Sequence, residues 1–393
     1  MKKLFIAAIM SLSLLMTSAF AEIKVGIILG FTGPIESLTP AMRDSAKLAF
    51  QEASDSGALL GGETITVIEG DSTCVDSAAA QSVAEGQVSQ GVVAIMGADC
   101  SGVTGAIASN VAVPNGVVMI SPSATSPGLT TLDDKGLFFR TAPSDARGGQ
   151  ILADITKDRG IKSVAITYTN NDYGKGLADV YEAAVKAHGI SVTVVAAHED
   201  GKADYSAEVG VLASAGGDAV AVIGYLDQGG KGIIQGSIDS GAFDTFILSD
   251  GMIGDSLTDA FGKSLNKSFG SLPGSTGKGA GIFTKVASAA GIDSSGPYTG
   301  ESYDAAALIV LAIQAGGSAD RASIAKNVMA VANGPGKKIY PGQLKKGLDL
   351  LAKGKAIDYE GATGVTFTDV GEAVGSFLEK EIKYGKFKTK KQR

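Results

Sequence analysis

The chain has 393 residues with 34 basic and 41 acidic side chains, a formal net charge of −7, and 45% hydrophobic residues. Its acidic balance argues against a nucleic-acid-binding protein, which needs stripes of Lys and Arg. The length exceeds that of one ordinary domain and predicts two.

The first 21 residues predict an export signal. Lys2 and Lys3 precede the apolar core Leu4–Met16, and the stretch Ala19–Ala21 has the small-x-small pattern that signal peptidase cleaves. We therefore expect cleavage after Ala21 and a periplasmic protein, and removal of 21 of the 393 residues leaves 372. No later apolar run reaches the ~18 to 20 residues that span a bilayer.

Residues 22–121 alternate between apolar strands and helices with one apolar face. Strands are expected at 23–29, 64–69, 92–96 and 117–121. Helices are expected from about residue 40 and at about 76–89 and 105–112. This order is typical of a parallel, doubly wound sheet, so the predicted fold class is α/β.

The same alternation starts afresh after Pro143 and predicts a second α/β lobe. Its strands are expected at 163–168, 190–197, 219–223 and 245–248, with helices at about 147–159, 174–188, 205–215 and 229–240. The Gly- and Ser-rich stretch 266–281 suggests a surface loop or a crossover between the lobes.

The last third of the chain has no sheet of its own in this interpretation. Three helices near 301–315, 320–331 and 343–353 follow one another without strands between them, so we expect them to cover an existing sheet. Residues 363–387 suit edge strands added late to one lobe. The Lys-rich tail 383–393 is interpreted as a frayed, solvated end rather than a partner site.

Small hydroxylated residues follow two neighbouring strands of the first lobe. Ser101 and Thr104 come just before the helix expected at 105–112, and Ser123 and Thr125 follow the next strand. Hydroxyl and backbone N–H groups at a helix N-terminus favour an anion. Because the carboxyl ends of strands in one βαβ unit can lie side by side, these residues predict a pocket for a carboxylate.

In the second lobe the residues after the strands are Tyr173, Tyr225 and Asp250. A carboxylate suits an ammonium group, so the two lobes together describe a pocket for a zwitterion. Each residue taken singly has an ordinary explanation, since Ser and Thr cap helices, Tyr packs at rims and Asp before Gly makes turns.

Residues that would indicate catalysis are scarce. The two histidines, His188 and His198, lack the spacing of a metal site. No G-x-S-x-G elbow, Walker loop or dinucleotide fingerprint occurs. We therefore expect no enzyme, no metal and no other cofactor.

Cys74 and Cys100 are the only cysteines of a chain expected to be exported, where oxidising conditions favour a disulfide. Because Cys100 precedes Ser101, a bridge would fix the proposed pocket loop to the end of the preceding strand. Plain stabilisation, without any site, explains the pair equally well.

Several motifs in this order resemble the substrate-binding proteins of branched-chain amino-acid ABC transporters, the type I periplasmic binding proteins typified by the Leu/Ile/Val-binding protein. They cover nearly the whole mature chain and comprise 23–27 (IKVGI), 32–34 (TGP), 97–101 (GADCS), 120–125 (ISPSAT), 140–142 (RTA), 171–177 (NDYGKGL), 224–225 (GY) and 303–305 (YDA). The two cysteines also match the family's disulfide positions.

The resemblance implies two doubly wound parallel-sheet lobes with a ligand cleft between them and three crossovers that form a hinge. It places the first lobe at 22–141 plus about 272–354, and the second at 142–271 plus about 355–393. The late helices would then cover the first lobe, and the final strands would return to the second.

The resemblance also implies roles for residues of the pocket. Hydroxyls matching Ser101 and Thr125, with the backbone at Ser123, hold the ligand's α-carboxylate, and the acidic residue matching Asp250 holds its α-ammonium. Aromatic residues matching Tyr173, Tyr225 and Tyr303 line the cleft.

Two positions depart from the family pattern. Asp250 stands where Leu/Ile/Val binders commonly have Glu. Glu36 and Leu38 stand where those binders place an aromatic residue against the ligand side chain. The ligand side chain therefore stays open, and Glu36 could favour a polar or cationic one.

We expect an exported, monomeric binding protein that closes over a small amino acid or related carboxylate and delivers it transiently to a membrane ABC permease. Two alternatives stay open at this point. One is a ligand sensor that reports to a membrane receptor, and the other is a secreted α/β enzyme.

Overall fold

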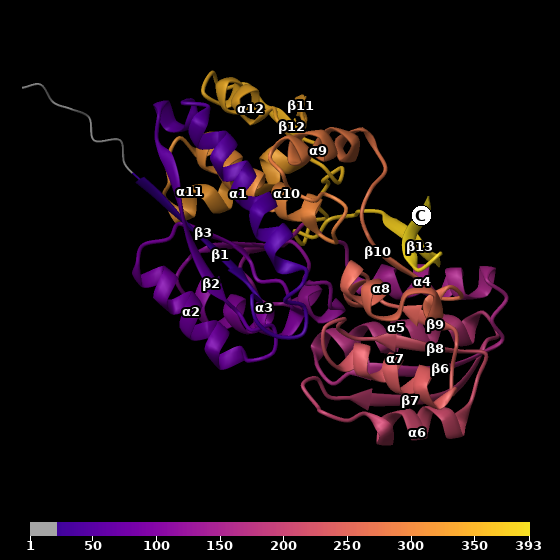
Figure 1. Ribbon diagram of the computed structural model, residues 1–393. Helices are drawn as coiled ribbons and strands as arrows, with labels where there is room; N and C mark the ends of the chain where they lie inside the picture. Colours follow the sequence, from indigo (N-terminus) through magenta and orange to yellow (C-terminus); the bar gives the residue numbers. More distant parts are fainter. Residues whose placement is uncertain (1–21) are drawn as a thin grey trace, which may run out of the picture.

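The computed structural model describes residues 22–393, and the predicted signal with its cleavage site lies outside this range. The described chain forms two lobes, each built on a β-sheet covered by helices (Figure 1). Among the described residues no helix is long and apolar enough to cross a membrane.

The first lobe is built on a five-stranded parallel sheet with the strand order β2-β1-β3-β4-β5. Its strands are β1 (Glu22–Leu29), β2 (Thr64–Asp71), β3 (Ala94–Gly97), β4 (Val118–Ser121) and β5 (Phe138–Arg140). β3 and β4 are buried along their whole length, as continuous apolar strands covered on both faces are. The strands predicted for this region are confirmed, with small shifts at their ends.

Helices from both halves of the sequence cover this first sheet or pack on the helices that cover it (Figure 1). They are α1 (Thr39–Asp55), α2 (Ser77–Ser89), α3 (Ser101–Ile107), α9 (Lys278–Ala289), α10 (Thr299–Gly316), α11 (Arg321–Ala332) and α12 (Leu344–Leu351). Helix α10 packs against α1, α11, β3 and β4. Its stretch Ala305–Ile313 has no polar residue, because a helix surrounded by others is apolar on every side.

The second lobe is built on a seven-stranded sheet with the order β14-β13-β10-β9-β8-β6-β7, in which only β13 runs opposite to the other strands. The strands are β6 (Ser163–Thr169), β7 (Ser191–His198), β8 (Ala219–Ile223), β9 (Phe246–Leu248), β10 (Phe269–Pro273), β13 (Phe377–Lys383) and β14 (Lys386–Gln392). The helices are α4 (Asp145–Asp158), α5 (Asp172–Ala187), α6 (Ser206–Ala215), α7 (Gly229–Ser240) and α8 (Asp255–Phe261).

Three sequence expectations were wrong in this part of the molecule. The stretch 266–281 is not one surface loop, because β10 and the start of α9 occupy most of it, but the crossover between the lobes that was the alternative does follow β10. The tail 383–393 is not frayed, since β14 pairs with β13 and Arg393 bonds to Glu379 and Asp158. Strand β11 (Lys337–Ile339) also lies between α11 and α12 and pairs with β12 (Ile357–Tyr359).

The chain passes between the lobes three times, after β5, after β10 and after β12. The last crossover is held by Asp304 of α10, whose carboxylate accepts hydrogen bonds from the Tyr359 hydroxyl (2.8 Å) and the backbone N–H groups of Ala362 (2.7 Å) and Thr363 (2.9 Å). The lobe boundaries expected near 272 and 355 stay predictions.

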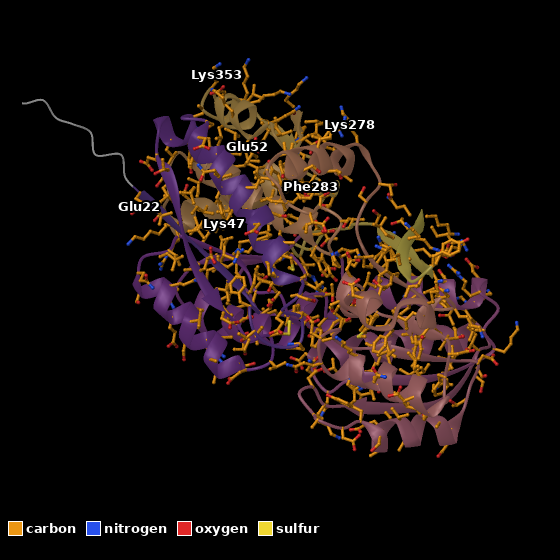
Figure 2. All side chains as sticks on the ribbon, in the orientation of Figure 1. Glu22, Lys47, Glu52, Lys278, Phe283 and Lys353 are labelled. Carbon is orange, nitrogen blue, oxygen red and sulfur yellow. A yellow bond between two sulfur atoms is a disulfide. The ribbon has the colours of Figure 1, made fainter. Side chains whose placement is uncertain are left out.

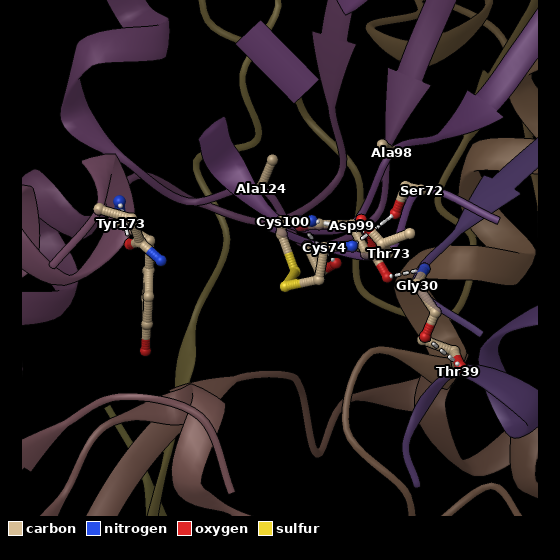
Figure 3. Close-up of a disulfide and its surroundings, with 12 residues drawn as sticks. Gly30, Thr39, Ser72, Thr73, Cys74, Ala98, Asp99, Cys100, Ala124 and Tyr173 are labelled. Atoms are coloured by element: carbon tan, nitrogen blue, oxygen red, sulfur yellow. Dashed lines mark hydrogen bonds between the residues drawn. A yellow bond between two sulfur atoms is a disulfide. The ribbon is translucent and has the colours of Figure 1, made fainter. Parts of the chain in front are cut away.

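Cys74 and Cys100 form the expected disulfide in the first lobe (Figure 3). Cys74 follows β2 and Cys100 follows β3, and β1 lies between these two strands in the sheet. The bridge therefore joins two loops at the carboxyl edge of the sheet across the end of the strand between them.

We expect the double substitution Cys74→Ser and Cys100→Ser to lower the free energy of unfolding by roughly 3 to 4 kcal/mol, because a cross-link of this span restricts the unfolded chain. Urea unfolding of both forms, followed by circular dichroism, measures the difference. Mass spectrometry of the unreduced protein should first show the linked peptide, and two free thiols would contradict the bridge.

Candidate functional site

A cavity of about 30 Å³ lies between the two lobes at the carboxyl edges of both sheets. The first lobe lines it with Ile35, Leu38, Met42, Asp99, Cys100, Ser101, Ser123 and Tyr298, and the second with Tyr173, Tyr225, Asp250 and Gly251. The structure thus brings together five of the seven ligand-binding residues expected from the sequence, together with Leu38.

Asp99 fixes the loops on the first-lobe side of the cavity. Its carboxylate is 2% exposed and accepts hydrogen bonds from the backbone N–H groups of Gly30 (2.5 Å) and Cys100 (2.9 Å) and from the Ser72 hydroxyl (3.0 Å). These partners follow β1, β3 and β2, so one side chain joins three strand ends (Figure 3). Gly97 just before it is required, because a Cβ there would lie 2.1 Å from the Ile28 carbonyl oxygen.

Two serines present hydroxyl groups to the cavity. Ser101 begins α3, and its Oγ accepts a hydrogen bond from the backbone N–H of Ser126 (3.1 Å), which leaves the Ser101 proton free to donate to a ligand. The Ser123 hydroxyl donates to the Asp99 carbonyl (3.1 Å), so its oxygen can accept from a ligand. Ser101 is therefore the stronger candidate for holding an anion.

Thr125 and Thr104 lie behind the first-lobe residues that line the cavity and do not line it themselves. Both side chains are buried, and neither hydroxyl has a hydrogen-bond partner among the described residues. The loop that carries Thr125 is held by Arg140, whose guanidinium donates to the carbonyl oxygens of Ala124 (3.1 Å) and Ser126 (2.8 Å). Arg140 is fully buried and pairs with Glu372 (2.6 Å).

The second-lobe side of the cavity is organised around the carboxylate of Asp250. Tyr173 donates its hydroxyl to Asp250 Oδ1 (2.6 Å), and its ring stacks on Tyr225 with 5.1 Å between the ring centroids. The hydroxyl of Tyr298, which comes from the first lobe, donates to Asp250 Oδ2. Burial raises the pKa of the Asp250 carboxyl, and the two tyrosine hydroxyls oppose that shift.

Asp145, at the start of α4, is a second buried carboxyl beside this group and was missed by the sequence interpretation. Its pKa is raised well above the ordinary value, first by burial and then by the charge of Asp250. Its Oδ2 has no donor among the described residues. Sequence reasoning examined the residues that follow strands, whereas Asp145 follows the first crossover and would have shown only as an acid in the first turn of a helix.

Tyr303 and Glu36 lie elsewhere. Tyr303 is buried inside the first lobe, where its hydroxyl donates to Glu52 and its ring packs on Phe283, so it does not line the cavity. Tyr298, five residues earlier, takes the place expected for it. Glu36 is exposed and outside the cavity, which removes the reason for expecting a cationic ligand side chain.

The lobes are closed on each other across the cavity. The Asp227 carboxylate of the second lobe accepts from the backbone N–H of Ser37 (2.9 Å), and its own N–H donates to the Pro34 carbonyl (3.0 Å). The Ser126 hydroxyl donates to the Asp172 carbonyl (3.0 Å) on another side of the cleft. The loop with Asp227 thus holds the segment that carries Ile35 and Leu38 into the cavity.

The arrangement offers a hydroxyl donor at one end, the carboxyl of Asp250 at the other with Asp145 buried behind it, and the apolar side chains of Ile35, Leu38 and Met42 beside them. Among residues 22–393 no group of three or more His, Cys, Asp or Glu side chains is placed to hold a metal ion. The geometry suits binding of a small molecule that carries an anionic and a cationic group.

The model of the periplasmic binding protein family matches residues 22–342. The chain is a periplasmic binding protein. Within this family, this binding protein is 32% identical over 318 residues to Leu/Ile/Val-binding protein homolog 1 of Brucella melitensis, a match that covers 79% of the chain and 82% of that protein. Homolog 3 of the same bacterium is also 32% identical, over 227 residues, but the match covers only 54% of the chain and 57% of that protein.

The binding protein also shares its fold with a solved branched-chain amino-acid transporter substrate-binding protein, LivJ from Streptococcus pneumoniae in complex with isoleucine. The TM-score is 0.77 at 23% identity, and the match covers 95% of this chain and 99% of that one. The fold is thus that of the type I periplasmic binding proteins of the branched-chain amino-acid type. Family membership makes it an exported periplasmic protein that binds a solute and is not an enzyme.

Asp227→Ala should shift the unliganded binding protein toward an open form, because the carboxylate no longer accepts from Ser37 of the other lobe; the bond from the Ser256 hydroxyl that is lost with it lies within the second lobe. These bonds are partly exposed to water, so we expect a loss of about 1 kcal/mol in closure, or about five-fold in the closed-to-open ratio. Small-angle X-ray scattering measures the change as a larger radius of gyration. Asp239→Ala, which removes an exposed carboxylate on α7, is the matched control, and equal radii for the two variants would contradict the role of Asp227.

Proposed function

We propose that the protein binds a small aliphatic α-amino acid between its lobes. The observation that carries this proposal is the buried carboxyl of Asp250, with the buried carboxyl of Asp145 beside it, at a cavity whose lining residues include no Lys, Arg or His among those that the structure describes. A buried carboxylate without a cationic partner is costly. The ammonium group of a ligand supplies that partner.

The first-lobe wall of the cavity indicates where the carboxylate and the side chain of the ligand lie. Its carboxylate meets the free proton of Ser101 and the backbone around Ser123, with Thr125 close behind. Its side chain points to Ile35, Leu38 and Met42, which favour a short hydrocarbon. Tyr173, Tyr225 and Tyr298 close the cavity from the other side.

Closure of the lobes completes these contacts, because Tyr298 reaches Asp250 from the other lobe. The ligand and the closed form therefore stabilise each other. A monomer in the periplasm that presents this closed form to a membrane ABC permease is the role that the family membership supports best. Ligand uptake by vesicles reconstituted with the permease would distinguish transport from a sensing role.

A thermal-shift screen of the twenty amino acids and related acids tests the ligand class. A ligand at ~100 times its Kd should add roughly 2.7 kcal/mol of stability.

Asp250→Asn should weaken binding about 100-fold or more, because it removes the charge that faces the ammonium and leaves the shape of the side chain unchanged. Asp239→Asn is the control and should bind like the native protein.

The proposal fails if no small amino acid or carboxylate shifts the melting temperature of the native protein. An Asp250→Asn variant with undiminished affinity would remove Asp250 from the site but keep the ligand class. A shift caused by carboxylic acids without an amine would contradict the role of the two carboxyls.

Affinity for the amino acid should rise with pH. Burial raises the pKa of Asp250 and of Asp145 above their ordinary value of 3.8, whereas an ammonium partner favours the ionised forms, so binding releases protons. In the free protein the same raised pKa values favour stability at low pH, and that contribution is lost as pH rises through them.

Isothermal titration between about pH 5 and about pH 8 should give a Kd that falls over this range and an apparent enthalpy that depends on the buffer's ionisation enthalpy. Asp145→Asn should flatten the profile. A Kd independent of pH, with no proton release, would contradict the coupling.

A further inference from the structure

The last two strands form a hairpin whose charge is opposite to that of the rest of the protein. Residues 383–393 carry six basic side chains and no acidic one. Two of the 34 basic residues precede residue 22, so residues 22–382 hold 26 basic side chains against all 41 acidic ones, a net charge of −15. Strand β14 is the outer edge of the second sheet, at the yellow end of the chain (Figure 1).

Part of this positive charge has no partner within the molecule. Lys390 and Arg393 reach Glu379, and Lys383 reaches Glu381. Lys386, Lys388 and Lys391 are exposed and form no ion pair with any described residue. In the ladder Lys386 lies directly opposite Lys383, whereas Lys388 and Lys391 lie opposite Glu381 and Glu379 without coming within ion-pair distance of them.

The tip of the hairpin presents an aromatic side chain to solvent. Tyr384 is 85% exposed, and it stands in the turn between Lys383 and Lys386 with a φ of 56°. Lysines on an edge strand commonly prevent pairing with another sheet, which explains their charge. That role does not explain an exposed tyrosine among them, whereas an aromatic ring flanked by lysines is the composition that anchors proteins at lipid headgroups.

We propose that the β13–β14 hairpin docks the protein on an anionic phospholipid bilayer. The lysines supply attraction to the headgroup phosphates, and Tyr384 enters the headgroup layer. No residue of the hairpin lines the ligand cavity, so docking leaves the cavity accessible. The acidic remainder of the protein is repelled by the same surface, which orients the molecule with its hairpin toward the bilayer.

Flotation of the mature protein with vesicles tests the proposal. Vesicles of phosphatidylglycerol and phosphatidylcholine in equal parts should carry the protein at low salt, and pure phosphatidylcholine vesicles should not. Removing one lysine lowers the partition coefficient about five-fold. The double variant Lys386→Glu and Lys388→Glu should therefore lower the partition coefficient at least ~25-fold. This variant keeps the edge strand charged and so keeps its protection against sheet pairing.

Two further double variants serve as controls. Lys386→Arg and Lys388→Arg should retain binding, because the charge is unchanged. Lys353→Glu and Lys355→Glu alter the total charge equally on the other lobe, where Figure 2 labels Lys353, and should bind vesicles nearly as well as the native protein. Melting temperatures of all variants show whether they are folded.

Tyr384→Ala should weaken binding to the mixed vesicles without changing its salt dependence. Equal partition of the native protein into both kinds of vesicle would overturn the proposal, as would equal losses for the hairpin variant and the Lys353 variant. Binding to a soluble acidic protein with none to vesicles would overturn the assignment to a bilayer and give the hairpin a protein partner.

Discussion

The burial of one carboxylate, that of Asp250, is the constraint on which the arrangement of the two lobes depends. Removing a charged carboxylate from water costs several kcal/mol unless hydrogen bonds and an opposite charge replace the water. Tyr173 supplies one hydrogen bond from the same lobe, but the second comes from Tyr298 on the other lobe and exists only when the lobes are closed. The opposite charge comes from no residue that lines the cavity. The proposed ligand would supply this charge with its ammonium group, and closing the lobes and filling the site would then be parts of one equilibrium.

The loops of the first lobe that line the cavity are held rigid by hydrogen bonds and by the disulfide. Asp99 ties three strand ends together, the disulfide joins two of the same loops, and Arg140 holds the carbonyl groups of the loop that carries Thr125. Each of these groups keeps a loop in one conformation, so Ser101, the proposed carboxylate contact, is held in place without a ligand. Preorganisation of this kind lowers the entropy that binding would otherwise cost. Arg140 also pairs with Glu372 of the third crossover, so the binding loop and the hinge share a buried ion pair.

Strand and helix order was predictable, because apolar runs and helical spacing report local burial. The position of the cavity at the carboxyl edges of the sheets was also predictable, because parallel strands end at the same edge of a sheet. The sequence could not show which of two tyrosines, Tyr298 or Tyr303, faces the cavity, since this depends on the turn before α10 and not on spacing. Asp145 was hidden for a similar reason: its nearness to Asp250 arises only when the first crossover brings α4 beside the end of β9. Ser101 and Asp250, to which the family resemblance assigned ligand contacts, both line the cavity, but the resemblance did not reveal Asp99 or Arg140 as supports.

The central helix of the first lobe also determines the order in which the protein can fold. Helix α10 fills the space between α1 and α11, and the N–H of Leu60 bonds to Gln314 Oε1 (2.7 Å). The strands β1 to β5 are synthesised first. Their core is complete only when α10, which follows β6 to β10 in the sequence, has also been synthesised. Contacts of such long sequence separation slow folding and leave apolar strands exposed in the meantime. The core of the first lobe is therefore completed only after most of the second lobe has been synthesised, when α10 to α12 become available.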